Sequence, residues 1–302
     1  MSKAETIDKI ENVISILQSP DDGTPLNADL VSEGGIQYEI SNSGILMLTP
    51  QKTSRAEVVY SNSMFSKWNS ILDERIQYYT KNNSIAGLLA NYSYRSMRKF
   101  EFESSGGWLL DIGCGDGSQI AYLKDRTHYI GLDTNLKRLE ILKKTYPDVI
   151  AVYGDAANLP FRSESLKFVF SCNAFEHVWY LKDAVFEIFR CITEEGLSIV
   201  VVPTEGGLWN LGRILISKPF FQKHHPDINF DFISHIEHCN NAKQIVRSFQ
   251  TFFHTEQKYR PLRIPTILLN AYIEIHGRKK KLKFANTSHQ RSIFEENTAS
   301  GS

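Results

Sequence analysis

The sequence predicts an α/β fold in which helices cover both faces of a mostly parallel sheet. From residue 108 onward, short apolar runs alternate with amphipathic stretches, which is the pattern of strands connected by helices. Such alternation is typical of a parallel sheet, because parallel neighbours need a crossover connection between them. The 302 residues, with 42% hydrophobic and 23% charged side chains, also have the composition of a globular protein and enough length for two domains.

Each predicted element follows from its own run of residues. Apolar runs predict strands near 108–112, 128–132, 149–153, 167–172 and 197–202, and helical spacing predicts helices near 117–125, 135–146, 181–192 and 241–253. Upstream, aromatic and apolar residues at helical spacing predict two helices between 53 and 100. The expected domains are an N-terminal module at 1–52, a helical lid at 53–104, a core at 105–204, a substrate-covering insert at 205–238, the C-terminal part of the core at 239–277 and a basic, polar tail at 278–302.

The N-terminal module is predicted to be small and rich in β-structure, with a turn-rich stretch at 19–25 and an alternating stretch at 36–40. Its frame of prolines, glycines and apolar residues resembles a short zinc-ribbon module. In the four metal positions of that module this chain has Ser19, Asp22, Val31 and Gly34. Because no thiolate remains there, we expect no structural zinc, and the module must rely on apolar contacts with the rest of the chain.

Charge and cysteine usage exclude several classes of protein. Lys and Arg together number 34, as do Asp and Glu, so no global field draws the chain onto nucleic acid. No apolar run is long enough to span a bilayer, and the N-terminus lacks the apolar centre of a signal peptide, so a cytoplasmic location is expected. The four cysteines are widely spaced, and we expect them to be free thiols.

A glycine turn follows the first strand of the predicted core, in the run Asp111-Ile-Gly-Cys-Gly-Asp-Gly117. Glycines allow positive φ and a close approach of a ligand, and the backbone N–H groups at the next helix start can donate to it. Glycine turns between strand and helix are common, so this signal is weak by itself. A dinucleotide loop would place its third glycine where this chain has Ser118, which disfavours a nicotinamide cofactor.

Two further strands each end in a carboxylate. Asp133 lies near the offset at which an acid accepts hydrogen bonds from both ribose hydroxyls. Asp155 lies where the edge of an adenine would be, and the N–H of Ala156 is a candidate donor to the same base. The alternative is that each acid only caps the helix or turn that follows it. The coincidence of three strand ends favours a nucleoside-containing cofactor.

With these motifs the chain resembles the class I S-adenosylmethionine-dependent methyltransferases, in the branch of small-molecule, quinone and sugar enzymes. The resemblance covers about 105–203. It implies a Rossmann-like sheet of seven strands, the last two forming an antiparallel hairpin. It further implies that S-adenosyl-L-methionine binds with its methionine part over the glycine turn, near Asp111 and Asn173. The full cofactor-binding set is then Asp111, Gly113, Cys114, Gly115, Gly117, Asp133, Thr134, Asp155, Ala156 and Asn173.

Methyl transfer needs alignment of the two partners and exclusion of water, and it needs a base only if the acceptor arrives protonated. His177, after the fourth strand of the core, is one candidate base, with a packing role as the alternative. Glu237 and His238 form the rival candidate, with a solvated helix entry as the alternative. The histidines have no recognised ligand spacing, so no metal is expected.

The predicted function is therefore methylation, by S-adenosyl-L-methionine, of a small-molecule or glycan acceptor, at oxygen rather than carbon. The main alternative is a ribosomal RNA guanine methyltransferase, which the neutral charge and missing cysteines disfavour. A non-catalytic methyltransferase-like scaffold subunit is disfavoured by the complete glycine turn, and a dehydrogenase by Ser118. Nucleic acid is not an expected partner, and the basic run at 278–283 is expected to be solvated. Oligomeric state and the acceptor's identity do not follow from these residues.

Overall fold

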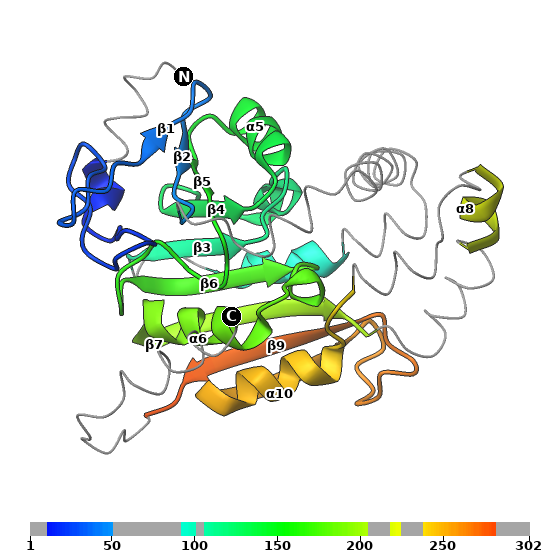
Figure 1. Ribbon diagram of the computed structural model, residues 1–302. Coiled ribbons are helices and arrows are strands. Elements are labelled where there is room, and N and C mark those ends of the chain that lie inside the picture. The colour runs from blue at the N-terminus through cyan, green and yellow to red at the C-terminus, as the bar shows by residue number, and fades with distance from the viewer. Residues whose placement is uncertain (1–10, 51–91, 101–105, 205–217, 225–237, 282–302) are drawn as a thin grey trace, which may run out of the picture.

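A single mixed sheet organises the part of the chain that the structure describes. The computed structural model describes residues 11–50, 92–100, 106–204, 218–224 and 238–281 (Figure 1). Within these residues the sheet has nine strands in the order β1-β2-β5-β4-β3-β6-β7-β9-β8. The strands are β1 (Glu39–Ile40), β2 (Ile45–Met47), β3 (Trp108–Ile112), β4 (Tyr129–Asp133), β5 (Ile150–Tyr153), β6 (Leu166–Cys172), β7 (Ile192–Pro203), β8 (Phe253–Arg260) and β9 (Tyr272–Lys279).

The predicted core sheet is present. Strands β5, β4, β3, β6 and β7 pair in parallel, whereas β9 is antiparallel to both β7 and β8. The last two strands therefore form the antiparallel hairpin that the sequence resemblance implied. This arrangement is the Rossmann-like fold of class I methyltransferases, and β1 and β2 extend it by two strands beyond the predicted seven.

Helices cover both faces of the sheet, as the alternating pattern predicted. The helices are η1 (Arg95–Lys99), η2 (Ser118–Tyr122), α5 (Leu136–Thr145), η3 (Phe175–His177), α6 (Leu181–Cys191), α8 (Lys218–His224) and α10 (Ala242–Phe252). One apolar core joins the inner sides of α6 and α10 to strand residues such as Leu110, and a second joins η1, η2 and α5 to residues such as Leu109. Neighbouring residues of one strand thus belong to opposite cores, because successive side chains in a strand point to opposite faces.

One predicted helix is shorter than expected. The sequence predicts a helix at 117–125, but the structure has only the short 3₁₀ helix η2, which ends when the backbone N–H of Leu123 bonds to Ile120. Asp125 then accepts bonds from both the backbone and the hydroxyl of Thr127. This local turn competes with helical hydrogen bonds, so the chain leaves the helix here.

The N-terminal module joins the sheet instead of packing on it only through apolar contacts. Strand β2 pairs in parallel with β5, with Ile45 opposite Ala151. In Figure 1 the blue N-terminal segment continues the sheet beyond β5. Further along, Leu17 forms a β-bridge with Phe161. The module therefore covers the edge that β5 would otherwise expose.

Ser19 and Asp22, two of the four residues that the sequence resemblance aligned with metal positions, form hydrogen bonds within the module. The Ser19 hydroxyl accepts from the backbone N–H groups of Asp21 and Asp22, both at 3.2 Å, and lies 2.8 Å from the Tyr38 hydroxyl. The Asp22 carboxylate accepts from the Ser32 hydroxyl at 2.8 Å. No group of three metal-ligating side chains occurs in the described residues.

One domain boundary differs from the expected one. The basic run expected to be a tail from 278 begins inside β9, where Arg278 donates to the carbonyl of Glu195 and Lys279 pairs with Glu164. Most of the expected lid at 53–104 and of the insert at 205–238 lies outside the described residues. In the described part of the chain, no helix is long and apolar enough to cross a bilayer.

Candidate functional site

The glycine turn leaves β3 at the carboxyl end of the parallel strands. Gly113, Gly115 and Gly117 all have positive φ, at 71°, 54° and 77°. A Cβ on Gly113 would collide with Ala174, and one on Gly117 with Leu142, so these two glycines are required by packing. A Cβ on Gly115 would meet only the Arg138 side chain, at 3.8 Å. Gly115 therefore faces space in which a ligand could lie against the backbone.

Asp111 lies in β3 just before this turn and is completely buried. Its Oδ2 accepts from Gln119 Nε2 at 2.6 Å and from the Tyr129 hydroxyl at 2.7 Å. Its Oδ1 is buried and has no hydrogen-bond partner among the described residues. Burial raises the pKa of Asp111 to about 7, although the bonds from Tyr129 and Gln119 favour the charged form. Such a buried carboxylate oxygen can accept a hydrogen bond from a ligand or contact a cation.

Asp133 ends β4 and contacts the glycine turn directly. Its Oδ2 accepts from the backbone N–H of Gly115, and its Oδ1 from that of Asn135, both at 2.8 Å. Burial raises its pKa, and these backbone bonds oppose the rise. The capping alternative is thus realised in part, because Asp133 holds the turn before α5. The next residue, Thr134, is exposed at the same edge of the sheet.

Asp155 follows β5 and starts the loop that leads to Phe161. It accepts from the backbone N–H of Ala157 at 2.9 Å, so it too stabilises a turn, and burial raises its pKa. The neighbouring Ala156 is 7% exposed and belongs to a core cluster. The loop is held from outside by Arg190, whose guanidinium donates to the carbonyls of Phe161 at 2.6 Å and Leu159 at 3.0 Å.

Asn173 follows β6 in the left-handed region, with φ of 53°. Its backbone N–H donates to Val201 at 2.9 Å. Its side-chain Oδ1 is buried and, like Asp111 Oδ1, has no hydrogen-bond partner among the described residues. Strained backbone at a non-glycine residue persists where the surrounding structure enforces it, which is common at binding sites.

The two candidate bases come together. The rings of His177 and His238 lie edge to face, with centroids 4.8 Å apart, although the residues are distant in sequence. Asn240 holds the segment after His238 against η3, because its side-chain amide donates to the carbonyls of Phe175, the first residue of η3, and of Val178, directly after it. The His177 side chain is 32% exposed. The third candidate, Glu237, lies outside the described residues.

Several residues that support this edge carry no sequence motif. Gln119 and Tyr129 hold the carboxylate of Asp111, and each is a polar group within an otherwise apolar run. The side chain of Cys114, a residue expected in the cofactor set, packs in the core against Gly131. The Cys114 carbonyl accepts from Gln119 at 2.9 Å. Such pairs join different strands and helices, and only the folded chain reveals them.

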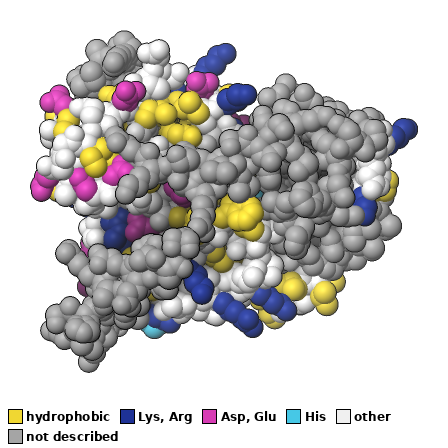
Figure 2. All heavy atoms as spheres, viewed as in Figure 1, with side chains coloured by type: hydrophobic (Ala, Val, Ile, Leu, Met, Phe, Trp, Pro, Cys, Tyr) yellow, Lys and Arg dark blue, Asp and Glu magenta, His cyan; other side chains and the backbone are white. Residues whose placement is uncertain are grey.

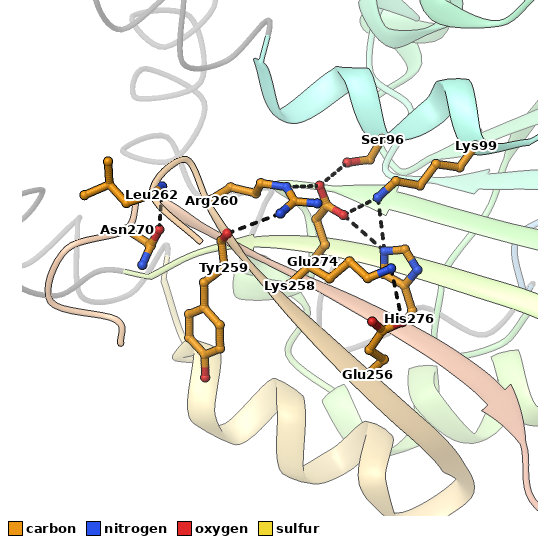
Figure 3. A network of polar contacts seen from close by, with 10 residues as sticks. All are labelled: Ser96, Lys99, Glu256, Lys258, Tyr259, Arg260, Leu262, Asn270, Glu274 and His276. Atoms are coloured by element: carbon orange, nitrogen blue, oxygen red, sulfur yellow. Dashed lines mark hydrogen bonds and ion pairs between the residues drawn. The ribbon is translucent and has the colours of Figure 1, made fainter. Parts of the chain in front are cut away.

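A polar network anchors η1 to the edge of the sheet (Figure 3). Glu274 on β9 is 5% exposed and accepts from the Ser96 hydroxyl at 2.8 Å and from Arg260 Nε at 3.1 Å. Lys99 and His276 contact its other carboxylate oxygen. Burial alone would raise the pKa of Glu274, but the hydrogen bonds and the Lys99 charge outweigh it and hold this pKa well below its usual range.

Sequence comparison finds similar proteins for the central part of this chain. Residues 110–200 match the family model described as a methyltransferase domain. A Mycolicibacterium smegmatis protein named as a probable S-adenosylmethionine-dependent methyltransferase is 28% identical over 41% of this chain and 51% of its own length. A phthiotriol/phenolphthiotriol dimycocerosates methyltransferase of Mycobacterium ulcerans is 26% identical over 48% of this chain and 55% of its own. The chain thus spans about half the length of these curated relatives.

Solved structures of low sequence identity are also similar to this chain. A methyltransferase from Thermotoga maritima, described as S-adenosylmethionine-dependent, has 18% identity and a TM-score of 0.46, covering 72% of this chain and 98% of its own. The strand order is that of a Rossmann-like class I methyltransferase fold, and residues 110–200 within it match a methyltransferase domain. S-adenosylmethionine is the cofactor of that class of domain.

Proposed function

We propose that this protein is an S-adenosylmethionine-dependent methyltransferase that uses the carboxyl edge of β3, β4, β5 and β6. One observation carries the proposal: buried oxygens of Asp111 and Asn173, which have no hydrogen-bond partner in the described part of the chain, flank a glycine turn that is open at Gly115. A ligand that carries an ammonium group would donate hydrogen bonds to both oxygens, while the rest of the ligand lies against the backbone of the glycine turn. The methionine part of the cofactor has that chemistry.

The remaining residues have distinct roles in this proposal. Asp133 accepts hydrogen bonds from the ribose hydroxyls and keeps its bond from the backbone N–H of Gly115. Asp155 and the backbone of Ala156 form hydrogen bonds with the edge of the adenine. The backbone of the turn, including Gly113, Cys114 and Gly117, shapes the cradle, and Thr134 borders the ribose. Burial of the three acids strengthens each of these contacts, because competing water is excluded.

The cofactor supplies an activated methyl group on a sulfonium, so the protein has to align the acceptor and handle its proton. Bound at this edge of the sheet, the cofactor would supply that methyl group to an acceptor oxygen. The acceptor's proton passes to a base, for which the structure offers the His177–His238 pair. His177 is partly exposed beside Trp179 and Tyr180, which are 42% and 39% exposed, so an acceptor can approach there.

We infer that the acceptor is a small hydroxylated molecule, with a glycan or a lipid alcohol as the two chemical types to test first. Neutral overall charge supports a compact acceptor over a long RNA, which would need a broad basic surface. The lipid type enters because relatives are named for methylation of phthiotriol dimycocerosates.

Calorimetry tests the cofactor proposal. The protein should bind S-adenosylhomocysteine and show no heat with NAD. Asp133→Asn should weaken binding by about 1–3 kcal/mol, because the ribose hydroxyls lose a charged acceptor. Asp148→Asn, which removes a partly exposed partner of Arg126, is the matched control and should bind normally. Tight NAD binding, or unchanged affinity in Asp133→Asn, would contradict the proposal.

A transfer assay with methyl-labelled cofactor tests the acceptor. Sugars, small alcohols and lipid alcohols are offered beside ribosomal RNA, and the rate is measured between 50 and 200 mM salt. Turnover of a small acceptor should change little with salt, whereas an RNA held through several phosphates should lose affinity by orders of magnitude. Activity on RNA alone with steep salt dependence would favour the ribosomal alternative, and cofactor binding without any transfer would favour the scaffold alternative.

A further inference from the structure

The loop between β8 and β9 exposes a cluster of aliphatic side chains. Residues 261–271 form this loop. Four of its large side chains are strongly exposed: Leu268 at 59%, Leu262 at 55%, Ile264 at 45% and Leu269 at 42%. Single exposed leucines are ordinary, but four in eight residues form a patch that calls for a partner.

Hydrogen bonds from one buried side chain fix the backbone of this loop, which keeps the aliphatic residues at the surface. The Asn270 side chain accepts from the backbone N–H of Leu262 at 2.9 Å and donates to the carbonyls of Ile264 and Thr266 at 2.7 and 2.8 Å. Figure 3 shows Leu262 and Asn270 facing each other across the loop. Asn270 is itself 3% exposed. The braced backbone therefore presents the aliphatic groups outward.

Basic residues surround the aliphatic cluster in a chain with no net charge. Residues 241–274 contain five basic side chains and two acids, and Lys258 pairs with Glu256 while Arg260 pairs with Glu274. The three other basic residues are Lys243, Arg247 and Arg263. Lys243 and Arg247 line a groove of about 290 Å³ that runs beside the loop, with an apolar floor that includes Val246 and Ile267. In Figure 2, dark blue side chains gather along the lower edge, over α10, next to yellow ones.

This patch lies on the same edge of the sheet as the candidate site. The backbone N–H of Thr204, directly after β7, donates to Ala271 at 2.9 Å, and its hydroxyl donates to Asn270. In Figure 1 the arrow of β6 points toward the side on which the orange β8–β9 loop protrudes. A surface that engaged the loop would therefore lie at the carboxyl end of the parallel strands, where the candidate site lies.

We propose that the β8–β9 loop docks this face of the protein onto an anionic lipid bilayer. Leu262, Ile264, Leu268 and Leu269 insert at the boundary between headgroups and acyl chains, while Lys243, Arg247 and Arg263 contact the anionic headgroups. Apolar insertion combined with basic flanks is the chemistry of peripheral membrane binding. A protein partner is the weaker match, since interface centres favour aromatic residues and the cluster has none.

The docking concerns a surface outside the cofactor site and does not depend on the proposed reaction. Given that reaction, docking brings a membrane-embedded acceptor to the mouth of the site. Membrane docking and the proposed methyl transfer can be refuted independently, because vesicle binding is measured without cofactor and cofactor binding is measured without vesicles.

Flotation with vesicles tests the proposal on the full chain. Vesicles of phosphatidylcholine with about one third phosphatidylglycerol should float the protein at low salt, and pure phosphatidylcholine should float far less. The double variant Leu268→Glu, Leu269→Glu should bind at least tenfold more weakly, and Arg247→Glu should lose most of the preference for the anionic lipid. Ile141→Glu, at a 45% exposed position on α5, is the matched control and should float normally.

Cofactor binding and fluorescence show whether each variant is still folded and whether the loop inserts into the vesicles. Each variant should bind S-adenosylhomocysteine as the parent does, and Leu268→Trp should show a blue-shifted emission when anionic vesicles are added. Failure of the parent to float, or equal flotation of the double variant, would overturn the proposal. So would a parent that forms a dimer which the double variant abolishes, because the patch would then be an interface between copies.

Discussion

The side-chain amide of Asn158 donates a 2.6 Å hydrogen bond to the backbone carbonyl of Pro20, 138 positions earlier in the chain. Asn158 belongs to the loop after β5 that we assign to the adenine, and Pro20 belongs to the N-terminal module. The contact is reinforced nearby, where the backbone N–H of Arg162 donates to Ile16 at 2.8 Å. The module therefore holds the outer side of the proposed adenine loop.

Replacing Asn158 should loosen that loop. We expect Asn158→Ala to weaken S-adenosylhomocysteine binding by about 1 kcal/mol in calorimetry, because one hydrogen bond that orders the loop is lost. Asn241→Ala, which removes the capping box of α10, is the matched control. It should lower the melting temperature while leaving the affinity unchanged. Equal affinities in Asn158→Ala and the parent would show that the module does not order the site.

Cofactor affinity should depend on pH through Asp111. Burial raises the pKa of this carboxyl to about 7, whereas an ammonium group beside it favours the carboxylate. The free site must therefore release a proton on binding below pH 7, so affinity should rise by about tenfold from pH 6 to pH 8. Calorimetry over this range measures the slope. Asp111→Asn should flatten it, Asp148→Asn should not, and a flat profile in the parent would contradict the assignment.

Removal of the base should slow transfer without affecting cofactor binding. Whichever of His177 and His238 takes the acceptor's proton should lose about 10²- to 10⁴-fold in kcat when changed to alanine. Binding of S-adenosylhomocysteine should persist in both variants. His128→Ala is the control, since that ring packs on Trp108, with centroids 5.1 Å apart. Two fully active variants would remove both candidates.

The N-terminal module should be stable without metal. Elemental analysis should find well under one zinc per chain, and a chelator should leave the melting temperature unchanged. Ser19→Ala should destabilise the protein by about 1–3 kcal/mol, because Ser19 is buried and two backbone donors lose their acceptor. Ser43→Ala, at an exposed turn, should have little effect. Stoichiometric zinc would contradict the interpretation of this module.

Glu274 should make the protein sensitive to acid. Its pKa is depressed in the folded state, so its contribution to stability is present above the unfolded value of about 4.5 and is lost as the pH falls below it. Glu274→Gln should cost about 3 kcal/mol at pH 7, because Arg260 and Lys99 lose a buried partner. It should also flatten the acid limb of a melting-temperature profile. Glu256→Gln, at a 67% exposed side chain, is the control. A variant as stable as the parent at pH 7 would refute the role of this network.

The sequence alone was sufficient for the parallel core and for its strand ends. The apolar runs at 108–112 and 167–172 correspond to β3 and β6, because a strand buried on both faces is nearly continuous in apolar residues. The glycine turn and the acids at 133 and 155 lie at or just after strand ends, because polar residues and glycines interrupt the apolar runs that form the strands. Helix α10 starts where the pattern predicted it, at a capping box formed by Asn241 and Gln244.

Local sequence thus determined which segments are strands and helices and which residues end them, since propensity, periodicity and capping act over a few residues. Only the tertiary structure decided that β2 pairs with β5 and that the ring of His177 contacts that of His238. It also decided that Asp111 and Asn173 each have a buried oxygen with no hydrogen-bond partner among the residues that the structure describes. Each of these depends on contacts between residues far apart in the chain. Burial, not residue type, then sets their chemistry: the same carboxyl that would be ionised in water has a pKa of about 7 at Asp111 because the core excludes solvent around it.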